Sequence, residues 1–397
     1  MHEIKKKIKH ISVWLTLILL CAGCARTKTG ESAPAVTEAA LTAAPALTAE
    51  PTNTPVPEIA FVVLTPAPEV TREPEVPATQ EPFQPEETAA PAESGNREKF
   101  TAGAGVTTVA WISDTQHYAN TFPEIYPTIT GFLYEHRKDM NLAYVIHTGD
   151  LVHRNGDEEN WVRAKDAMDL LRDIPFGVLA GNHDMAESGG GYAGYSRWFG
   201  EQRFSDKPYY GASFQNNRGH YDLLTVGDTD YIFVYMSFEP DTEAIRFMTK
   251  AFLDYPDRVG ILCVHDFITT EGTLSEAGNT IRDRVLKNCP NCYMVLCGHR
   301  YGLYCLKDGF DDDGDGVFER TVYEMMMNYQ AAGKEGGSGY FRLMQFDDAA
   351  GEIRVLTYSE YLHDYNWLDD PAHNEPRYMM DETSEEFVLT MPWRVNR

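Results

Sequence analysis

Five short polar segments of this chain follow apolar runs and carry residue types that bind metal ions. They are Asp114-Thr115-Gln116, Gly149-Asp150, Gly181-Asn182-His183-Asp184, His265 and Gly298-His299. Carboxylate and amide oxygens suit hard cations, whereas imidazole suits zinc, iron or manganese, so the mixture predicts two divalent transition metal ions (Mn, Fe or Zn). Asp150 can bridge such a pair. Cations about 3.5 to 4 Å apart activate a water and hold the attacking and leaving oxygens of an in-line displacement at phosphorus.

The apolar runs that precede these segments must position them. They cover residues 109–112, 143–146, 176–179, 261–264 and 294–297. Each run has the length and composition of a strand buried on both faces. Every candidate ligand then lies at the carboxyl end of a strand, which is the edge where open α/β sheets bind ligands.

On these motifs the chain resembles the calcineurin-like metallophosphoesterase family over about residues 106–359, with Gly181-Asn182-His183-Asp184 as the most specific element. The resemblance implies an α/β fold, a four-layer αββα sandwich of two mixed sheets. It also implies site roles. Asp150 would bridge the two metals. One metal would also be bound by Asn182, His265 and His299, and the other by Asp114 and Gln116. His183 would protonate the leaving group, and Asp184 would orient His183.

The chain departs from the family pattern twice, and both departures concern the first metal. Gln116 and Tyr301 stand where the family usually has histidine. A neutral amide is a weak donor and a phenol must lose a proton of pKa about 10, so we expect Gln116 to be a weak ligand of a variant site. Tyr301 is open between metal binding and ordinary strand packing. His117 would face away from the site on an extended strand end, so it is a poor substitute for Gln116 unless the chain turns there. His153 is open between substrate binding and a surface role.

A second acidic segment has the spacing of a calcium loop. Asp311, Asp313, Asp315 and Glu319 occupy its first, third, fifth and ninth positions, with glycine at the sixth. The usual glutamate at the twelfth position is absent, because Val322 stands there. The segment therefore predicts either a Ca site or an acidic hairpin turn.

The amino terminus indicates export. A basic start, an apolar run and small residues precede Cys24, which is typical of a lipoprotein signal peptide over residues 1–23 with lipid attachment at Cys24. An ordinary cleaved signal peptide is the alternative. Residues 24–98 are rich in Thr, Pro, Ala and Glu and hold 12 of the chain's 22 prolines, which predicts a disordered tether. We expect an extracytoplasmic, lipid-anchored protein of a bacterial cell membrane, with the phosphoesterase domain at 99–397.

Charge limits the class of partner. The chain has a formal net charge of -26, so it lacks the basic surface that binds a phosphate backbone, and we expect no nucleic acid. A small phosphorylated substrate stays possible, since bound cations reverse the field locally.

Other patterns predict the elements between the motifs. Helices are expected at 122–137, 158–172 and 243–254, a hairpin at 220–237, and mostly antiparallel strands at 301–306, 321–328, 340–346 and 353–358. Cys289 and Cys292 form a disulfide or flank a turn. The glycine-rich segment 189–199 suggests a flap whose aromatic residues either stack on substrate or pack onto the domain.

Two functions of different classes fit these observations. The first is metal-dependent hydrolysis of phosphate mono- or diesters by a tethered enzyme, with metal-activated water as nucleophile. The second is a non-catalytic lipoprotein that keeps the fold and one metal to bind a phosphorylated ligand. The missing imidazoles favour the second, whereas the intact His183-Asp184 pair favours the first.

Overall fold

The computed structural model describes residues 99–186, 191–330, 335–369 and 384–395. The predicted signal peptide, Cys24 and the tether lie outside these ranges. Within them, no helix is both long and apolar enough to cross a membrane.

Two sheets form the centre of the domain. The strands are β1 (Val106–Ile112), β2 (Leu142–His147), β3 (Phe176–Val178), β4 (Tyr210–Phe214), β5 (Gly219–Val226), β6 (Thr229–Met236), β7 (Val259–Val264), β8 (Cys292–Cys297), β9 (Gly302–Phe310), β10 (Arg320–Asn328), β11 (Tyr340–Asp347), β12 (Glu352–Ser359) and β13 (Glu386–Thr390). One sheet has the order β13-β12-β11-β1-β2-β3 and the other β4-β5-β6-β7-β8-β10-β9. Both mix parallel and antiparallel pairs.

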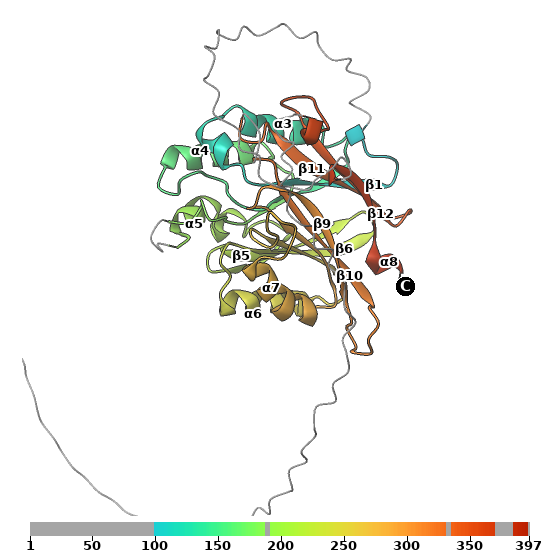
Figure 1. The fold of residues 1–397 in the computed structure, drawn as a ribbon. Helices are drawn as coiled ribbons and strands as arrows, with labels where there is room; N and C mark the ends of the chain where they lie inside the picture. Colours follow the sequence, from blue (N-terminus) through green and yellow to red (C-terminus); the bar gives the residue numbers. More distant parts are fainter. Residues whose placement is uncertain (1–98, 187–190, 331–334, 370–383, 396–397) are drawn as a thin grey trace, which may run out of the picture. The chain divides into compact units, whose positions relative to one another are not determined.

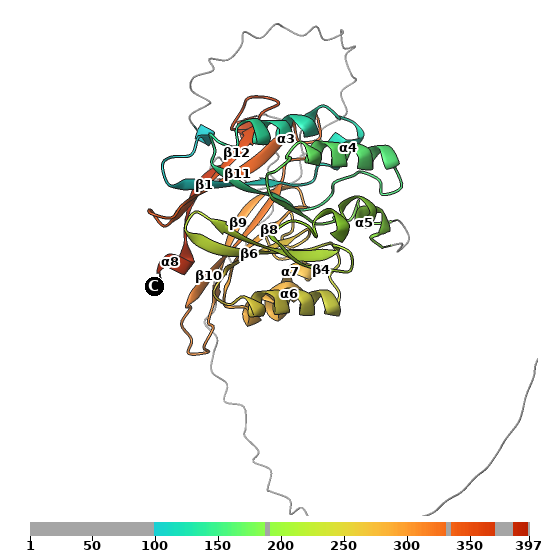
Figure 2. The same cartoon turned by 180° about the vertical axis from the view of Figure 1, so that it is seen from behind.

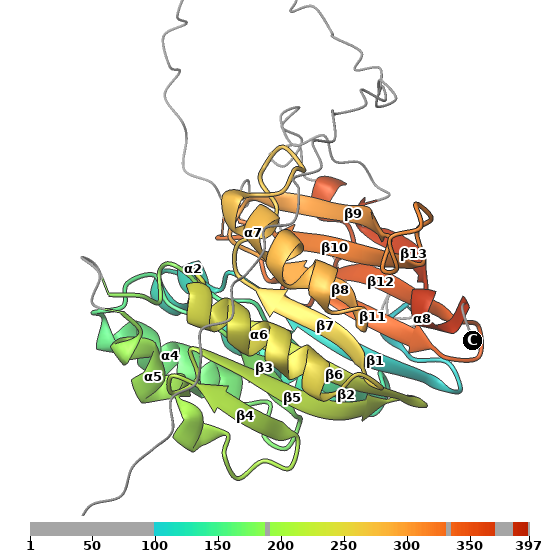
Figure 3. The same cartoon turned by 90° about the horizontal axis from the view of Figure 1, so that it is seen from below.

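The α-helices of the described residues are α2 (Gln116–Asn120), α3 (Ile125–Glu135), α4 (Glu158–Asp169), α5 (Ala193–Phe199), α6 (Thr242–Asp254), α7 (Glu276–Arg284) and α8 (Pro392–Val395). The short α8 packs Trp393 into the core between the sheets. Figure 1 shows α3 and α4 on one side of the stacked sheets and α6 and α7 on the other, and Figure 2 shows the same layers from behind. In Figure 3, α6 and α7 lie over β6, β7 and β8. The predicted αββα sandwich is confirmed.

Alternation along β1 explains the layers. Val109 and Trp111 enter the core between the two sheets, whereas Ala110 and Ile112 enter the core beneath the helices α3 and α4. All four side chains are buried. A strand apolar at every position fits only between two covered faces, which is why these runs contain no polar residue.

Most predicted elements agree with the structure. The helices predicted at 122–137, 158–172 and 243–254 correspond to α3, α4 and α6, and the hairpin corresponds to β5 and β6. The expectation of mostly antiparallel strands in the second half is correct for β9, β11 and β12. β10 is antiparallel to β9 and parallel to β8.

The cysteines and the predicted flap have structural roles. Cys289 and Cys292 are buried free thiols, so the disulfide is absent and they flank a turn in which Cys292 N donates to Cys289 O at 3.0 Å. Residues 189 and 190 of the flap lie outside the described ranges. Beyond them, α5 buries Tyr195 and Phe199 in the core, as expected if these aromatics pack onto the domain.

Candidate metal centre

The five motif segments meet at one edge of the sandwich. β1, β2 and β3 belong to one sheet and β7 and β8 to the other, and every segment follows the carboxyl end of its strand. Ligand atoms of Asp150, His265 and His299 lie within 4.8 Å of one another. Side chains that are 149 positions apart in the sequence, at Asp150 and His299, are thereby brought into one cluster.

The second metal's predicted ligands surround His265. Its Nε2 lies 3.2 Å from Asn182 Oδ1 and 3.4 Å from Asp150 Oδ2, and its Nδ1 donates to the carbonyl of Thr148 at 2.7 Å. The ring is fully buried. A proton on Nε2 thus lies between His265 and the oxygen atoms of two other predicted ligands. A metal ion bound by these side chains would occupy the same position. The residues present therefore fit a cation.

Electrostatics supports this fit. Burial opposes the charge of His265, but Asp150 and Asp114 raise its pKa to about 10. For Asp150, burial opposes ionisation, and the charge of His265 nevertheless lowers the pKa below its ordinary value. Burial, followed by the charge of His265, lowers the pKa of His299 to about 3, so His299 is neutral and keeps a lone pair for a metal.

The first metal's predicted ligands lie beside the bridging residue. Asp114 accepts hydrogen bonds from the backbone N of His299 at 3.1 and 3.2 Å. Gln116 Nε2 donates to Asp150 Oδ2 at 3.1 Å. Burial raises the pKa of Asp114 to about 7, so a cation that neutralises it would relieve an unfavourable charge. Tyr301 is 42% exposed. Among the described residues, it forms no hydrogen bond to these side chains.

Gln330 is a site residue that sequence reasoning missed. Its side chain contacts that of Gln116, and it follows Asn328 at the end of β10. Polar residues just beyond a strand are the same signal that marks the other five segments. The strand pattern alone does not say which edge β10 ends at, and its parallel pairing with β8 places Gln330 at the edge that holds the site.

The backbone of the site is strained at three of the predicted ligands. Asp114, Asp150 and His299 have φ values of 54°, 55° and 68°. Non-glycine residues adopt this region at a cost, and such residues cluster at functional sites. Two motif glycines allow the close approach of the loops. A Cβ on Gly181 would lie 2.1 Å from Asp150 Oδ1, and one on Gly298 would lie 2.2 Å from Asp114 Oδ2.

His183 is placed as predicted, but its orienting partner is different. Its backbone N donates to Asp150 Oδ1 at 2.9 Å, and its Nδ1 pairs with the carbonyl of His153 at 2.9 Å. The predicted role of Asp184 in orienting His183 is wrong. The Asp184 carboxylate is occupied by backbone N–H groups of Gly181, Leu151 and Val152 at 2.8 to 3.1 Å.

Two further imidazoles extend a row from His183. His153 stacks on His183 with ring centroids 5.2 Å apart, and His117 lies 5.3 Å from His153. His117 lies beside the site because the chain turns into α2 at Gln116, which is the condition under which the sequence allowed it to approach. Burial lowers the pKa of both His117 and His153, so these two rings are neutral hydrogen-bonding groups beside His183.

The predicted calcium residues also converge. One oxygen from each of Asp311, Asp313, Asp315 and Glu319 lies within 4.8 Å of the others, and all four side chains are exposed. Asp311 accepts from the backbone N of Gly314 at 2.6 Å, as a hairpin turn also requires.

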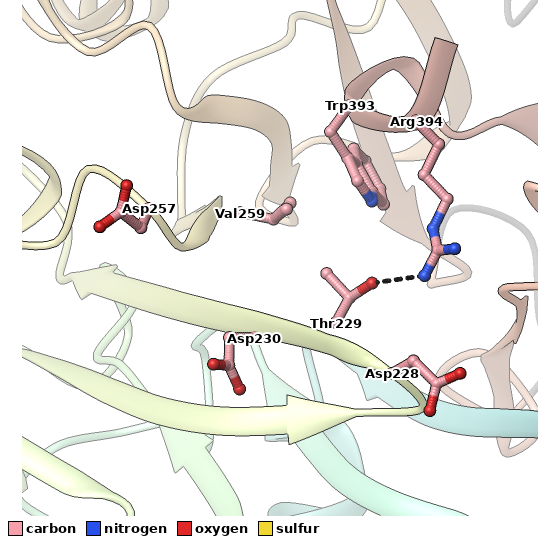
Figure 4. Close-up of a pocket in the computed structure, with 7 residues that line it drawn as sticks. All are labelled: Asp228, Thr229, Asp230, Asp257, Val259, Trp393 and Arg394. Carbon is pink, nitrogen blue, oxygen red and sulfur yellow. Dashed lines mark hydrogen bonds between the residues drawn. The ribbon is translucent and has the colours of Figure 1, made fainter. Parts of the chain in front are cut away.

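A separate pocket lies at the opposite end of the strands. It encloses about 530 Å³ and contains none of the predicted ligands. Figure 4 shows its lining, Asp228, Thr229, Asp230, Asp257, Val259, Trp393 and Arg394. Because Thr229 and Val259 begin β6 and β7, this pocket is at the amino ends of strands whose carboxyl ends face the candidate site.

Comparisons with known proteins agree with the motifs. The model of the family described as calcineurin-like phosphoesterase matches residues 107–301. The chain is 42% identical over 286 residues to the uncharacterized protein YvnB of Bacillus subtilis (strain 168), a match that covers 72% of this chain. The chain spans only 22% of the length of that relative.

Solved structures of similar architecture include two phosphatases. A purple acid phosphatase from yellow lupin (Lupinus luteus) seeds has a TM-score of 0.47 at 13% identity, covering 72% of this chain and 54% of its own. A dimetal phosphatase from Danio rerio has a TM-score of 0.43 at 10% identity, covering 72% of this chain and 99% of its own. Residues 107–301 therefore form a calcineurin-like phosphoesterase domain.

Proposed function

We propose that this protein hydrolyses phosphate esters, mono- or diesters, with divalent metal ions held at the edge described above. The observation that carries the proposal is the convergence of Asp150, His265 and His299 within 4.8 Å, with Asn182 beside them. These residues suit a transition metal such as Mn, Fe or Zn, because imidazole and carboxylate are combined. The calcineurin-like phosphoesterase domain supports the same activity.

The protein's own groups divide the work of the reaction. When bound, the metal pair supplies a water of lowered pKa as nucleophile and positive charge for the phosphate oxygens. Asp150 lies between the two ligand groups, in contact with Gln116 on one side and His265 on the other. His183 uses Nδ1 in its bond to the His153 carbonyl, so Nε2 is the atom that delivers a proton to the leaving oxygen.

The substrate is proposed to be a small phosphorylated molecule. With a formal net charge of -26, the chain would repel a long phosphate backbone, and the site depends on bound cations for attraction. The row formed by His117, His153 and His183 provides hydrogen-bonding imidazoles beside the metal ligands.

The enzyme is further proposed to act outside the cytoplasm, anchored through a lipid on Cys24. The support is the sequence of residues 1–24 and the proline-rich stretch that follows it. Labelling with a radioactive fatty acid should mark the wild-type protein, and the C24A variant should lose the label and leave the membrane fraction. A labelled C24A protein would contradict the anchor.

The experiment that tests catalysis compares metal-reconstituted wild type with Asp150→Asn. Release of nitrophenol from 4-nitrophenyl phosphate and bis(4-nitrophenyl) phosphate is measured, together with metal content. We expect wild-type turnover of at least one ester and its loss in the variant, because Asp150 contacts both ligand groups.

The alternative function is capture of a phosphorylated ligand without cleavage. Its support is the first-metal site, where Gln116 and Tyr301 stand in place of two imidazoles. A protein of this kind would bind metal and phosphate in titrations and release no nitrophenol. Among the described residues no hydrogen bond occupies His183 Nε2, so this atom is available for proton transfer, which a pure binder does not need.

A further inference from the structure

Gln330 enters the first-metal site from a strand that carries none of the motifs. It follows β10, and its backbone N donates to Asn328 Oδ1 at 2.9 Å. Asn328 in turn donates through Nδ2 to the carbonyl of His299 at 3.3 Å. Hydrogen bonds therefore connect the end of β10 to the loop of the predicted ligand His299. They fix the backbone position from which the Gln330 side chain extends.

The Gln330 amide is oriented by its nitrogen. Nε2 donates to the backbone carbonyl of Asp114 and to Gln116 Oε1, the latter at 2.6 Å. This leaves Oε1 of Gln330 facing Gln116 Nε2 at 3.2 Å. Because the carbonyl of Asp114 only accepts hydrogen bonds, it pairs with Nε2 of Gln330 and leaves Oε1 directed at Gln116.

Oxygen atoms of Gln330 and Asp150 converge on one nitrogen. Gln116 Nε2 lies 3.2 Å from Gln330 Oε1 and 3.1 Å from Asp150 Oδ2. An amide N–H group here does what a cation does, because it offers positive charge to acceptor atoms. A bound cation would take over these acceptors, and Gln116 would then turn its own Oε1 to the ion.

We propose that Gln330 is the fourth protein ligand of the first metal, in the role that the missing second imidazole has elsewhere in the family. This assignment rests on the metal-dependent function proposed above. The first site then consists of Asp114, Gln116, Asp150 and Gln330, all of which bind through oxygen.

An all-oxygen site has a different metal preference from its neighbour. Carboxylate and amide oxygens favour hard ions such as Mg²⁺ or Mn²⁺, whereas the imidazoles of His265 and His299 favour Zn²⁺ or Fe²⁺ at the second site. Two carboxylates, one of them shared, partly neutralise a divalent ion. The two sites thus form a hetero-dinuclear centre, in which the first site selects a harder metal ion than the second site.

Tyr301 is the competing ligand. It follows the Gly298-His299 motif at the expected spacing, but its side chain is 42% exposed. Gln330 is half-buried and in hydrogen-bond contact with Asp114 and Gln116. The geometry favours Gln330.

The test is metal titration of full-length protein freed of metal by a chelator. Mn²⁺ and Zn²⁺ binding is followed by calorimetry, metal content by elemental analysis, and Mn²⁺ environment by electron paramagnetic resonance.

Wild type should bind two ions, with Mn²⁺ preferred at one site. Q330A should weaken that site by about 10- to 100-fold and leave the other unchanged. Q330E, which keeps an oxygen ligand, should bind Mn²⁺ at least as tightly as wild type, and Q330H should shift the preference toward Zn²⁺.

Y301F is the matched control and should bind both ions like wild type. Equal affinities for two ions in Q330A and wild type would overturn the assignment, as would loss of the first site in Y301F. A wild type that binds one ion also overturns it, while leaving a one-metal function in place. A wild type that binds no metal instead contradicts the proposed function itself. If Q330A does not fold, as judged by thermal unfolding, Q330E and Q330H decide the question.

Discussion

The imidazole of His183 is held by the backbone of His153, whose carbonyl oxygen lies 2.9 Å from His183 Nδ1. A carbonyl can only accept, so the proton resides on Nδ1 and Nε2 is the atom that exchanges protons with substrate. The two rings also stack, with centroids 5.2 Å apart. His153 therefore sets both the tautomer and the tilt of His183.

Replacing His183 by alanine should reduce turnover by about 10²- to 10⁴-fold, because the variant lacks the proton donor. Metal content should stay at the wild-type value, since the ligands Asp150, Asn182, His265 and His299 are retained. Nitrophenol release and elemental analysis of the same preparation check both expectations. H363A, at an exposed histidine, is the control. Unchanged turnover in H183A would remove His183 from the reaction.

Asp184→Asn should destabilise the fold. The carboxylate accepts three backbone N–H groups, from Gly181, Leu151 and Val152, and an asparagine has one oxygen for them. Loss of these bonds should cost about 1 to 3 kcal/mol of unfolding free energy. Thermal unfolding of metal-free protein measures this cost, with D206N at an exposed aspartate as control. A normal melting temperature combined with an altered pH profile of turnover would instead indicate that Asp184 orients His183.

The motif residues could be predicted because each lies directly after a strand whose composition is unmistakable. Parallel strands of one sheet, such as β1 and β2, place their following residues at one edge, whatever the order of strands in the sheet. β1 and β7 belong to different sheets, so the meeting of Asp114 and His265 followed from the resemblance to the family and not from the strand pattern. The layers could be predicted for the same reason, from strands that are apolar at every position.

Gln330, His117 and Asp184 show what could not be predicted. Gln330 reaches the site only because β10 pairs in parallel with β8, and alternation along a strand contains no information about its neighbours. His117 depends on a turn into α2 that spans five residues and has no side-chain cap at Thr115 to mark its start. The partners of Asp184 are backbone groups, which have no signature in side-chain patterns.

Calcium should bind the acidic hairpin between β9 and β10. Oxygen atoms of Asp311, Asp313, Asp315 and Glu319 are already within 4.8 Å of one another, and clustered carboxylates repel until a cation neutralises them. Without a glutamate at the twelfth position we expect affinity at the weak end, about 10⁻⁴ to 10⁻³ M. Calorimetric titration should show this heat in wild type and not in D313N. No heat at millimolar calcium in wild type would leave these residues as a turn.

Glu324 should make the stability of the fold depend on pH. Its side chain on β10 is 2% exposed, and its Oε1 has no hydrogen-bond partner among the described residues. The nearby Arg282 is already paired with Asp308, through Nη2 and Oδ1 at 2.9 Å. Burial, followed by the charge of Asp308, raises the pKa of Glu324 to about 7.

Because the folded pKa exceeds the unfolded value of about 4.5, protonated Glu324 favours the native state. That contribution is complete below about pH 4.5 and is lost as the pH rises through 7, at a cost of roughly 3 kcal/mol. Glu324→Gln should therefore melt several degrees higher than wild type at pH 8 and nearly the same at pH 5. Melting curves at both values check this. E352Q, which removes one charge from an exposed position on β12, serves as control. Parallel pH profiles for E324Q and wild type would show that Glu324 is ionised in the native protein without penalty, which would require a partner for its buried oxygen.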